Sequence, residues 1–223
     1  MLRPHHLAII GAGPTGIDAA LAAPEAGLPY TLYEASSRPA GYIRQWGHVR
    51  LFSPWSLNVS PRMRRTLEAS GKPAPGGDAC PTGIELADRV FSPLVECRMI
   101  SPSLRLGTRV VAIGRQGLLK SSAIGDPRRG DHPFRLLVES PNGSTRTETA
   151  DAVLDCSGTY GKPNPTGDGG IPAPGEAVLG ESIVRHIPDF EAAVDTWASA
   201  RVLLVGAGHS AQTAVCGLAG LAE

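Results

Sequence analysis

Apolar positions near the start of the chain form short runs that glycine and proline separate. The run from Leu7 to Ile10 is followed at once by Gly11, which is typical of a buried parallel strand. From Pro14 to about Ala23 apolar residues recur at helical spacing, and Pro24 is expected to end or bend that helix because it lacks an amide hydrogen. Tyr30 to Glu34 predicts a second strand, so the pattern indicates a βαβ unit.

The pattern changes after the second strand. Ser36 to Cys80 is rich in Pro, Gly, Ser and Arg and shows little periodicity, which predicts a long irregular segment, either beside a bound ligand or as a surface loop. Gly83 to Glu96 has apolar residues spaced for a buried helical stripe, and Pro93 is expected to weaken the last turn of that helix.

Three strand-like runs follow this helix and are separated by polar or glycine-rich turns. They are Arg109 to Gly114, Phe134 to Glu139 and Ala152 to Cys156. Because polar or glycine-rich turns separate these runs, the pattern predicts a β-meander rather than another βαβ unit, at about residues 105–150.

The end of the chain repeats the pattern of its start. Arg201 to Val205 predicts a strand, and Ser210 to Leu221 predicts the helix that follows it. We therefore expect a nucleotide-binding domain over residues 1–175, a linker over 176–200, and the first βα unit of an incomplete second nucleotide-binding domain over 201–223.

Composition excludes several classes of protein. Among 223 residues, 42% are hydrophobic and 19% are charged, which is typical of a chain with a real core. Lys plus Arg and Asp plus Glu both count 21, so the net charge of zero offers no basis for binding nucleic acid or an anionic membrane. The sequence has no apolar span of 18 residues, no CxxC pair and no metal-ligand spacing, so we expect a cytoplasmic protein without a metal site.

The first glycine motif has the spacing of a phosphate-binding turn. In Gly11-Ala-Gly-Pro-Thr-Gly16 the first glycine makes the tight turn, Gly13 lets the backbone approach a pyrophosphate, and the third lets helix and strand pack closely. The helix N-terminus offers amide hydrogens and a partial positive charge to phosphates. Glu34 ends the second strand, where a carboxylate can accept hydrogen bonds from ribose hydroxyls. These residues predict a nucleotide site.

With the segment DAVLDCSGTYGKPNP (Asp151 to Pro165), these features resemble a known family. The chain is similar to the FAD domain of flavoprotein oxidoreductases, and more narrowly to the NAD(P)H-dependent, flavin-containing monooxygenases. In that family an Ala-Thr-Gly-like turn closes the FAD domain, and Cys156-Ser157-Gly158-Thr159 takes its place here. The resemblance implies an α/β fold: a Rossmann-like FAD-binding domain, with a parallel sheet and an inserted β-meander, followed by the start of a Rossmann-like NAD(P)-binding domain.

The resemblance also implies which residues hold each cofactor. The backbone near Val110 and Val111 would approach the adenine of FAD, and Gly158 would pack near the cofactor at the crossover. The residues implied for the ADP half of FAD are Gly11, Gly13, Pro14, Thr15, Gly16, Glu34 and Gly41. The residues implied for the pyrophosphate of NAD(P)H are Gly206, Gly208, Ser210 and Ala211.

Some positions depart from the family pattern. Ala40 replaces the usual first glycine of the pair that Gly41 completes, and Ile43 stands where a tryptophan is common. The monooxygenase fingerprint before the second motif is matched only by Gly180 and His186, at a gap two residues too long. Because the second motif is followed by few residues, we expect an N-terminal fragment or shortened relative of a protein about twice as long.

The resemblance favours an FAD-dependent oxidoreductase that takes hydride from NAD(P)H, with monooxygenation of a small organic substrate as one form of that activity. A truncated nucleotide-binding module or subunit without turnover is the alternative, and a single-nucleotide NAD(P) protein without flavin is a third reading. No catalytic side chain is assigned, because hydride transfer between two cofactors requires none. The expected partners are a small-molecule substrate and either a second copy of the chain or a completing C-terminal chain.

Overall fold

The computed structural model describes residues 6–221 and divides the chain into unit 1, Met1–Gly158, and unit 2, Thr159–Glu223. The division falls at Gly158, ahead of the boundary expected at residue 175. Each unit is described by itself.

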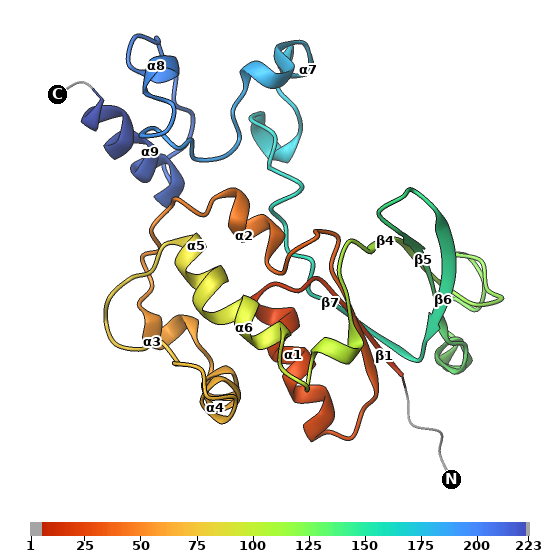
Figure 1. Ribbon diagram of the computed structural model, residues 1–223. Helices are drawn as coiled ribbons and strands as arrows, with labels where there is room; N and C mark the ends of the chain where they lie inside the picture. Colours follow the sequence, from red (N-terminus) through yellow and green to blue (C-terminus); the bar gives the residue numbers. More distant parts are fainter. Residues whose placement is uncertain (1–5, 222–223) are drawn as a thin grey trace. The chain divides into compact units, whose positions relative to one another are not determined.

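A parallel sheet forms the centre of unit 1. Its strands are β1 (Leu7–Ile10), β2 (Tyr30–Tyr33), β3 (Leu104–Arg105) and β7 (Ala152–Asp155). The order is β3-β2-β1-β7, with every neighbouring pair parallel (Figure 1). The chain builds outward from β1 through β2 to β3 and then returns to the other side of β1, so the strand order reverses at β1. The two predicted N-terminal strands are confirmed, whereas β3 is too short to show in the sequence pattern.

A three-stranded antiparallel sheet confirms the predicted meander but corrects its third strand. Its strands, in spatial order, are β4 (Arg109–Arg115), β5 (Phe134–Glu139) and β6 (Thr145–Ala150). The run predicted at Ala152 to Cys156 is β7 of the parallel sheet, which follows β6 after Asp151 alone. The sequence TRTETA gave no strand signal because most of its side chains are exposed and it owes its place to pairing with β5.

Helix α1 (Pro14–Glu25) connects β1 to β2 and runs slightly further than expected. Pro24 lies in its last turn, where the missing amide removes one hydrogen bond without ending the helix. The helix is closed by Gly27, whose φ of +67° is left-handed and whose N–H donates to the Pro24 carbonyl oxygen (3.0 Å). Leu28 N–H also donates to the Ala23 carbonyl oxygen (2.9 Å), which completes a Schellman cap.

The sequence pattern predicted an irregular segment from Ser36 to Cys80. This prediction is wrong, because the segment contains three helices. They are α2 (Gly41–Gln45), α3 (Trp55–Asn58) and α4 (Pro61–Ala69). The start of α4 is encoded locally, because the Ser60 hydroxyl accepts the Met63 N–H and Pro61 occupies the first helical position. Met63 and Leu67, four residues apart, bury one face. Runs this short show too little periodicity to be recognised in the sequence.

The predicted helix at Gly83 to Glu96 is one helical segment with a π turn inside it. Its parts are α5 (Gly83–Leu86), the π-helical turn η1 (Ala87–Phe91) and α6 (Ser92–Val95). Ser92 N–H donates to the Ala87 carbonyl oxygen, five residues back. Because the hydrogen-bond ladder has already shifted at this point, the next residue, Pro93, is tolerated and the segment continues to Val95.

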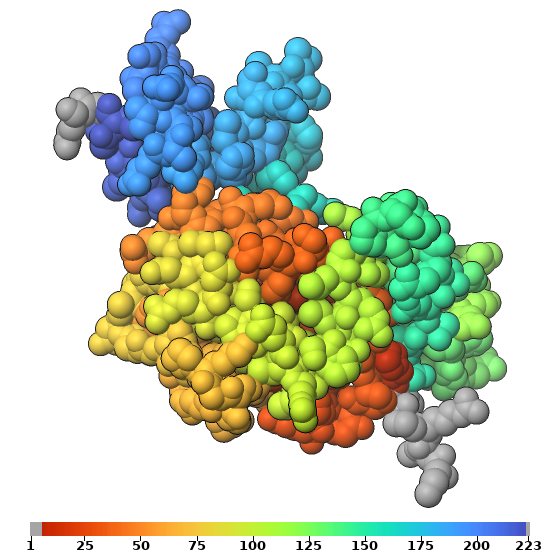
Figure 2. All heavy atoms as spheres, in the orientation of Figure 1, coloured from red at the N-terminus to blue at the C-terminus, as the bar shows by residue number. Residues whose placement is uncertain are grey.

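Unit 1 has three layers: helices, the parallel sheet, and the antiparallel sheet (Figure 1). Alternate residues of β1 face the two sides, with Leu7 and Ile9 in the core beneath the helices and Ala8 in a smaller core with Leu136 and Val138 of β5. On one face of unit 1, α5 (yellow) borders α2 (orange) in Figure 2. The short 3₁₀ turns are η2 (Ser101–Ser103) and η3 (Pro127–Asp131).

Unit 2 is helical in its described residues. Its elements are the 3₁₀ turns η4 (Asp168–Gly170) and η5 (Gly180–Ser182) and the helices α7 (Glu176–Leu179), α8 (Val194–Trp197) and α9 (His209–Gly220). The predicted helix after the second glycine motif is confirmed as α9. The strand predicted at Arg201 to Val205 is absent, and its side chains are largely exposed, because no strand of the described part of unit 2 is available to pair with it.

Candidate functional site

The turn between β1 and α1 depends on two of its glycines for close approach. Gly11 has a φ of +95°, and a Cβ placed on it would lie 2.7 Å from the carbonyl oxygen of Cys156. A Cβ on Gly16 would lie 1.8 Å from the carbonyl oxygen of Gly11. Gly11 N–H donates to the Tyr33 carbonyl oxygen (2.7 Å). These contacts seat the turn against both β2 and the end of β7, and no side chain fits at either glycine.

The middle glycine of the turn has a different environment. Gly13 is the N-cap of α1 with a φ of −86°, which any residue can adopt, and a Cβ on it would meet no described atom within 4 Å. The protein's own packing therefore does not require glycine there, and the space in front of the turn is open. Pro14, Thr15 and Gly16 form the first helical turn, which has no acidic residue and no side-chain cap from the described residues. Its free amides leave a partial positive charge facing that space.

Glu34 lies directly beneath this turn. Its side chain is buried, with Oε2 accepting the Ala12 N–H (2.8 Å) and Oε1 accepting the Ser36 N–H (2.9 Å). Each carboxylate oxygen can accept a second hydrogen bond, so the group retains capacity for hydroxyl donors. The carboxylate thus ties the loop after β1 to the loop after β2.

The loop after β2 approaches the same place. A Cβ on Gly41 would lie 2.6 Å from Cβ of Ser36 and 3.4 Å from Oε1 of Glu34, so glycine is required there by contact. Ala40 adopts a left-handed φ of +57°, and its N–H donates to the Ala12 carbonyl oxygen (2.9 Å). Ala12 therefore bonds through both backbone groups, to Glu34 and to Ala40.

The crossover after β7 completes this edge of the sheet. Cys156 N–H donates to the Ile10 carbonyl oxygen (2.8 Å), and Gly158 has a left-handed φ of +69°. Hydrogen bonds from the Ser157 side chain and backbone hold the pKa of Asp155 below its usual range. Burial, and then the charge of Asp155, raise the pKa of the Cys156 thiol, which keeps it protonated at neutral pH. The site lies at the carboxyl ends of β1 and β7, where the strand order reverses; in open α/β sheets this is the usual position of a ligand crevice.

The antiparallel sheet begins beside the same edge. Thr108 N–H donates to the Glu34 carbonyl oxygen (2.8 Å), so β4 starts next to the end of β2. Val110 pairs with Val138 and packs into the smaller core, whereas Val111 lies at a β-bulge with its side chain half exposed. Val110 is two residues from the Thr108–Glu34 contact, and the outward-facing Val111 follows it.

The second glycine motif lies in unit 2. Gly208 is the N-cap of α9 with φ −82° and ψ −179°, close to the −86° and −170° of Gly13. Gly206 has a φ of +131°, and a Cβ on it would lie 3.9 Å from Cβ of Ala211. Ser210 and Ala211 form the first turn of α9. The turn and helix therefore repeat the first motif, without its strand.

Several residues that build the site were not singled out by sequence reasoning. Ala12 and Ser36 donate backbone N–H groups to Glu34. Arg44 donates to the Pro39 carbonyl oxygen in the loop after β2 and is itself held by Asp88 and Ser92. Backbone donors leave no signal in the residue type. The four-residue spacing of Asp88 and Ser92 predicts that they share one face of a helix. Nothing in the sequence indicates that this face contacts Arg44.

Clusters of metal-ligating side chains, membrane-spanning helices and disulfides are absent from the described part of the chain. Among residues 6–221, no group of three or more His, Cys, Asp or Glu could hold a metal ion, and no helix is long and apolar enough to cross a membrane. All four cysteines are free thiols.

Comparison with known proteins yields a short sequence match. No protein-family model matches the chain. An L-amino-acid oxidase of Daboia russelii is 40% identical over 59 residues, which are 26% of this chain and 11% of that protein.

Solved structures give a broader match. The bacillithiol disulfide reductase Bdr from Bacillus cereus has a TM-score of 0.51 and 19% identity, covering 75% of this chain and 43% of that one. The S-allyl-L-cysteine S-oxygenase from Allium sativum has a TM-score of 0.50 and 20% identity, covering 69% of this chain and 36% of that one. A third structure, OTEMO in complex with FAD and NADP, has a TM-score of 0.50 and 15% identity, covering 69% of this chain and 26% of that one.

The chain spans less than half the length of each of these proteins. At these identities the structural matches concern the fold, and they cover 69–75% of the chain. The resemblance expected from the sequence is thus confirmed for the fold: the chain has a Rossmann-like α/β fold, which it shares with a disulfide reductase, an S-oxygenase and a protein solved with FAD and NADP.

Proposed function

We propose that unit 1 binds the ADP part of FAD at the turn between β1 and α1, and that the protein is an FAD-dependent oxidoreductase. One observation carries this proposal: Gly13 opens onto free space at the N-terminus of α1, while its neighbouring glycines are packed tightly and Glu34 lies beneath the turn. This arrangement fits a pyrophosphate on the helix N-terminus and a ribose on the carboxylate.

In this proposal each of the FAD-binding residues of unit 1 has a defined role. The first-turn amides of Thr15 and Gly16 donate to phosphate oxygens, and the Pro14 ring sets the start of the helix. Glu34 accepts ribose hydroxyls with the lone pairs that Ala12 and Ser36 leave free. The remaining contacts proposed for FAD are made by Gly41, the backbone at Val110 and Val111, and Gly158.

We also propose NAD(P)H as the electron donor. The support is the second turn, in which Gly208 caps its helix with nearly the backbone angles of Gly13 and is accompanied by Gly206, Ser210 and Ala211, together with the fold shared with a protein solved with FAD and NADP. Bound FAD supplies the two-electron acceptor that no side chain provides. Residues of this chain bind and orient the two nucleotides, and a small organic molecule is the proposed substrate, with monooxygenation as one outcome.

The setting of this activity is likewise a proposal. We propose a cytoplasmic enzyme on the basis of its free thiols. As its partner we propose a second copy of the chain or a different chain.

The direct test is a visible absorbance spectrum of the purified chain after incubation with FAD and gel filtration. A retained flavin band is the expected result, and anaerobic bleaching of that band by NADPH or NADH would establish the donor. A chain that is folded by circular dichroism but retains no flavin would contradict the proposed function.

The substitution Gly13→Ala isolates the ligand contact from the fold. Its Cβ meets no described atom within 4 Å and its φ is ordinary, so the unfolding free energy should fall by less than about 1 kcal/mol. FAD affinity should fall by about tenfold or more, because the methyl group occupies the space of the pyrophosphate. Titration of flavin fluorescence beside urea unfolding measures both. Gly130→Ala, at a glycine with ordinary φ and equal free space on the β4–β5 connection, controls for the mutation itself; equal FAD affinity in both variants would argue against this site.

A further inference from the structure

We propose that Arg44 is a positioning residue for the nucleotide site, which clamps the loop after β2 in the conformation that completes it. This inference rests on the proposed binding of FAD by unit 1. Arg44 does not touch the glycine turn itself. It acts on Pro39 and Ala40, and through them on Ala12.

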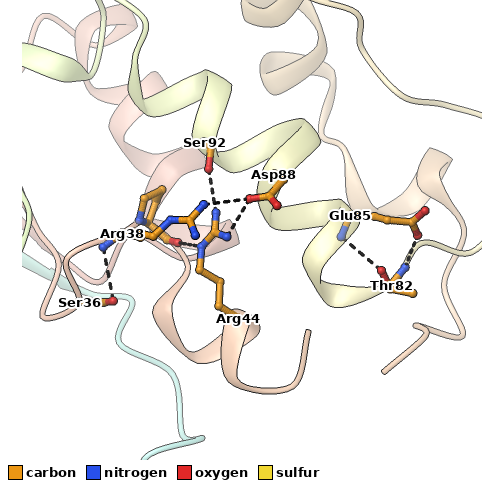
Figure 3. A network of polar contacts seen from close by, with 8 residues as sticks. Ser36, Arg38, Arg44, Thr82, Glu85, Asp88 and Ser92 are labelled. Carbon is orange, nitrogen blue, oxygen red and sulfur yellow. Dashed lines mark hydrogen bonds and ion pairs between the residues drawn. The ribbon is translucent and has the colours of Figure 1, made fainter. Parts of the chain in front are cut away.

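The Arg44 side chain joins the loop after β2 to two residues of the helical segment formed by α5, η1 and α6. Nε donates to the Pro39 carbonyl oxygen (3.0 Å), Nη1 to Oδ1 of Asp88 (2.7 Å) and Nη2 to Oγ of Ser92 (2.8 Å), as Figure 3 shows for the labelled residues. The side chain is only 11% exposed, so water competes little for these contacts. The planar guanidinium can reach three acceptors at once, which a lysine ammonium on its flexible stem cannot do in the same geometry.

The carbonyl group that Arg44 holds belongs to Pro39, which directly precedes Ala40, a residue with a strained backbone. Ala40 holds a left-handed φ of +57° although it is not glycine, and such a conformation persists only where surrounding contacts enforce it. The Arg44–Pro39 contact lies on one side of Ala40. On the other side, Ala40 N–H donates to the Ala12 carbonyl oxygen, and Ala12 N–H donates to Glu34. Release of Arg44 would therefore loosen the middle of the glycine turn.

The anchor of the clamp is built into the π turn. Asp88 lies inside η1 and Ser92 directly after it, four residues apart on one face of the helical segment. Figure 3 shows both side chains directed toward Arg44. Arg38 also reaches Oδ1 of Asp88 (3.3 Å), but its side chain is 61% exposed, so Arg44 is the buried partner.

The test compares FAD affinity in Arg44→Lys and Arg64→Lys, measured by flavin fluorescence on the full chain. Arg64 is the matched control, because it also clamps a proline-containing loop, through the Ala74 and Pro75 carbonyl oxygens (3.3 and 2.9 Å). If the binding-competent loop is populated about a tenth of the time in Arg44→Lys, the apparent Kd rises about tenfold. Arg64→Lys should leave Kd unchanged.

A second variant separates positioning from general loss of structure. Ala40→Gly in the Arg44→Lys background should restore most of the affinity, because glycine adopts a positive φ without strain. Without FAD, hydrogen exchange at the Ala40 amide should be faster in Arg44→Lys and unchanged in Arg64→Lys, which is a readout even if binding is lost.

The outcomes distinguish the two proposals. A folded wild-type chain that binds no FAD contradicts the proposed function, and exchange at Ala40 then still tests the clamp. A wild-type chain that binds FAD, with equal Kd and equal exchange in Arg44→Lys, overturns the role of Arg44.

Discussion

At the scale of single residues, glycines that look alike in the sequence serve different purposes. Gly11 and Gly16 are required by atoms of the protein itself, whereas Gly13 faces open space at the helix N-terminus. Gly13, a glycine that the fold does not need between two that it does, is the position where we propose that the FAD pyrophosphate approaches the backbone. Mutations at these positions should therefore separate stability from binding.

Gly11→Ala and Gly27→Ala test the stability half of this distinction. Both glycines have positive φ, +95° and +67°, so each alanine carries a conformational cost of about 1–2 kcal/mol. Only at Gly11 does the new Cβ also clash, at 2.7 Å from a backbone oxygen of Cys156, so its total cost should exceed about 3 kcal/mol. Urea unfolding followed by circular dichroism measures the difference. Equal losses in the two variants would show that the close approach to Cys156 is not a constraint.

At the scale of elements, helix ends are encoded locally whereas strand identity is not. Helix α5 begins with a capping box, in which Thr82 and Glu85 each accept the other's backbone N–H, and these contacts hold the pKa of Glu85 below its usual range. Figure 3 shows this pair at the start of the segment that anchors Arg44. In contrast, the sequence pattern missed β6 because only pairing with β5 makes TRTETA a strand.

The cap of α5 can be tested by Thr82→Ala. Loss of the hydroxyl leaves the Glu85 N–H without its acceptor, so the unfolding free energy should fall by about 1 kcal/mol. Thr82→Ser keeps the hydroxyl and should be within about 0.5 kcal/mol of the wild type. Denaturant titration checks both, and similar losses in the two variants would assign the effect to the methyl group instead of the cap.

At the scale of the whole molecule, the two units are stabilised by different kinds of interaction. Unit 1 has two apolar cores, one on each face of the parallel sheet. In unit 2, a polar centre is provided by Glu176, which accepts hydrogen bonds from the Ala173 N–H (2.8 Å), from the Thr166 N–H and hydroxyl, and from Arg185. Phe190 packs edge-on against Trp197, with ring centroids 5.5 Å apart.

Acid should therefore open this part of unit 2. Backbone donation from Ala173, then the Arg185 contact, lower the pKa of Glu176 from 4.5 to about 2 in the folded chain. A carboxylate with a depressed folded pKa stabilises the fold above its unfolded pKa, and this contribution is lost as pH falls from about 4.5 to about 2. Hydrogen exchange at the Thr166 and Ala173 amides should lose protection over that window.

Glu176→Gln provides the control for this acid effect. The variant should show weaker protection of the same amides at neutral pH and little further loss between pH 4.5 and 2, because it lacks the titrating group. Amides of β5 report on general acid unfolding of unit 1. Identical pH profiles in wild type and variant would exclude Glu176 as the responsible group.

Local residue patterns were enough to identify the first βαβ unit, its glycine turn and its terminal glutamate, because the apolar periodicity, the glycine spacing and the acid after the second strand can each be recognised within a few residues. Contacts between distant segments decided the rest. Ala152–Asp155 joined the parallel sheet beside β1, Ala40 was held in a strained conformation, and Arg44 met Asp88 and Ser92. Arg201–Val205 has the composition of a strand but formed none, since a strand requires hydrogen-bonding partners that its own sequence does not contain.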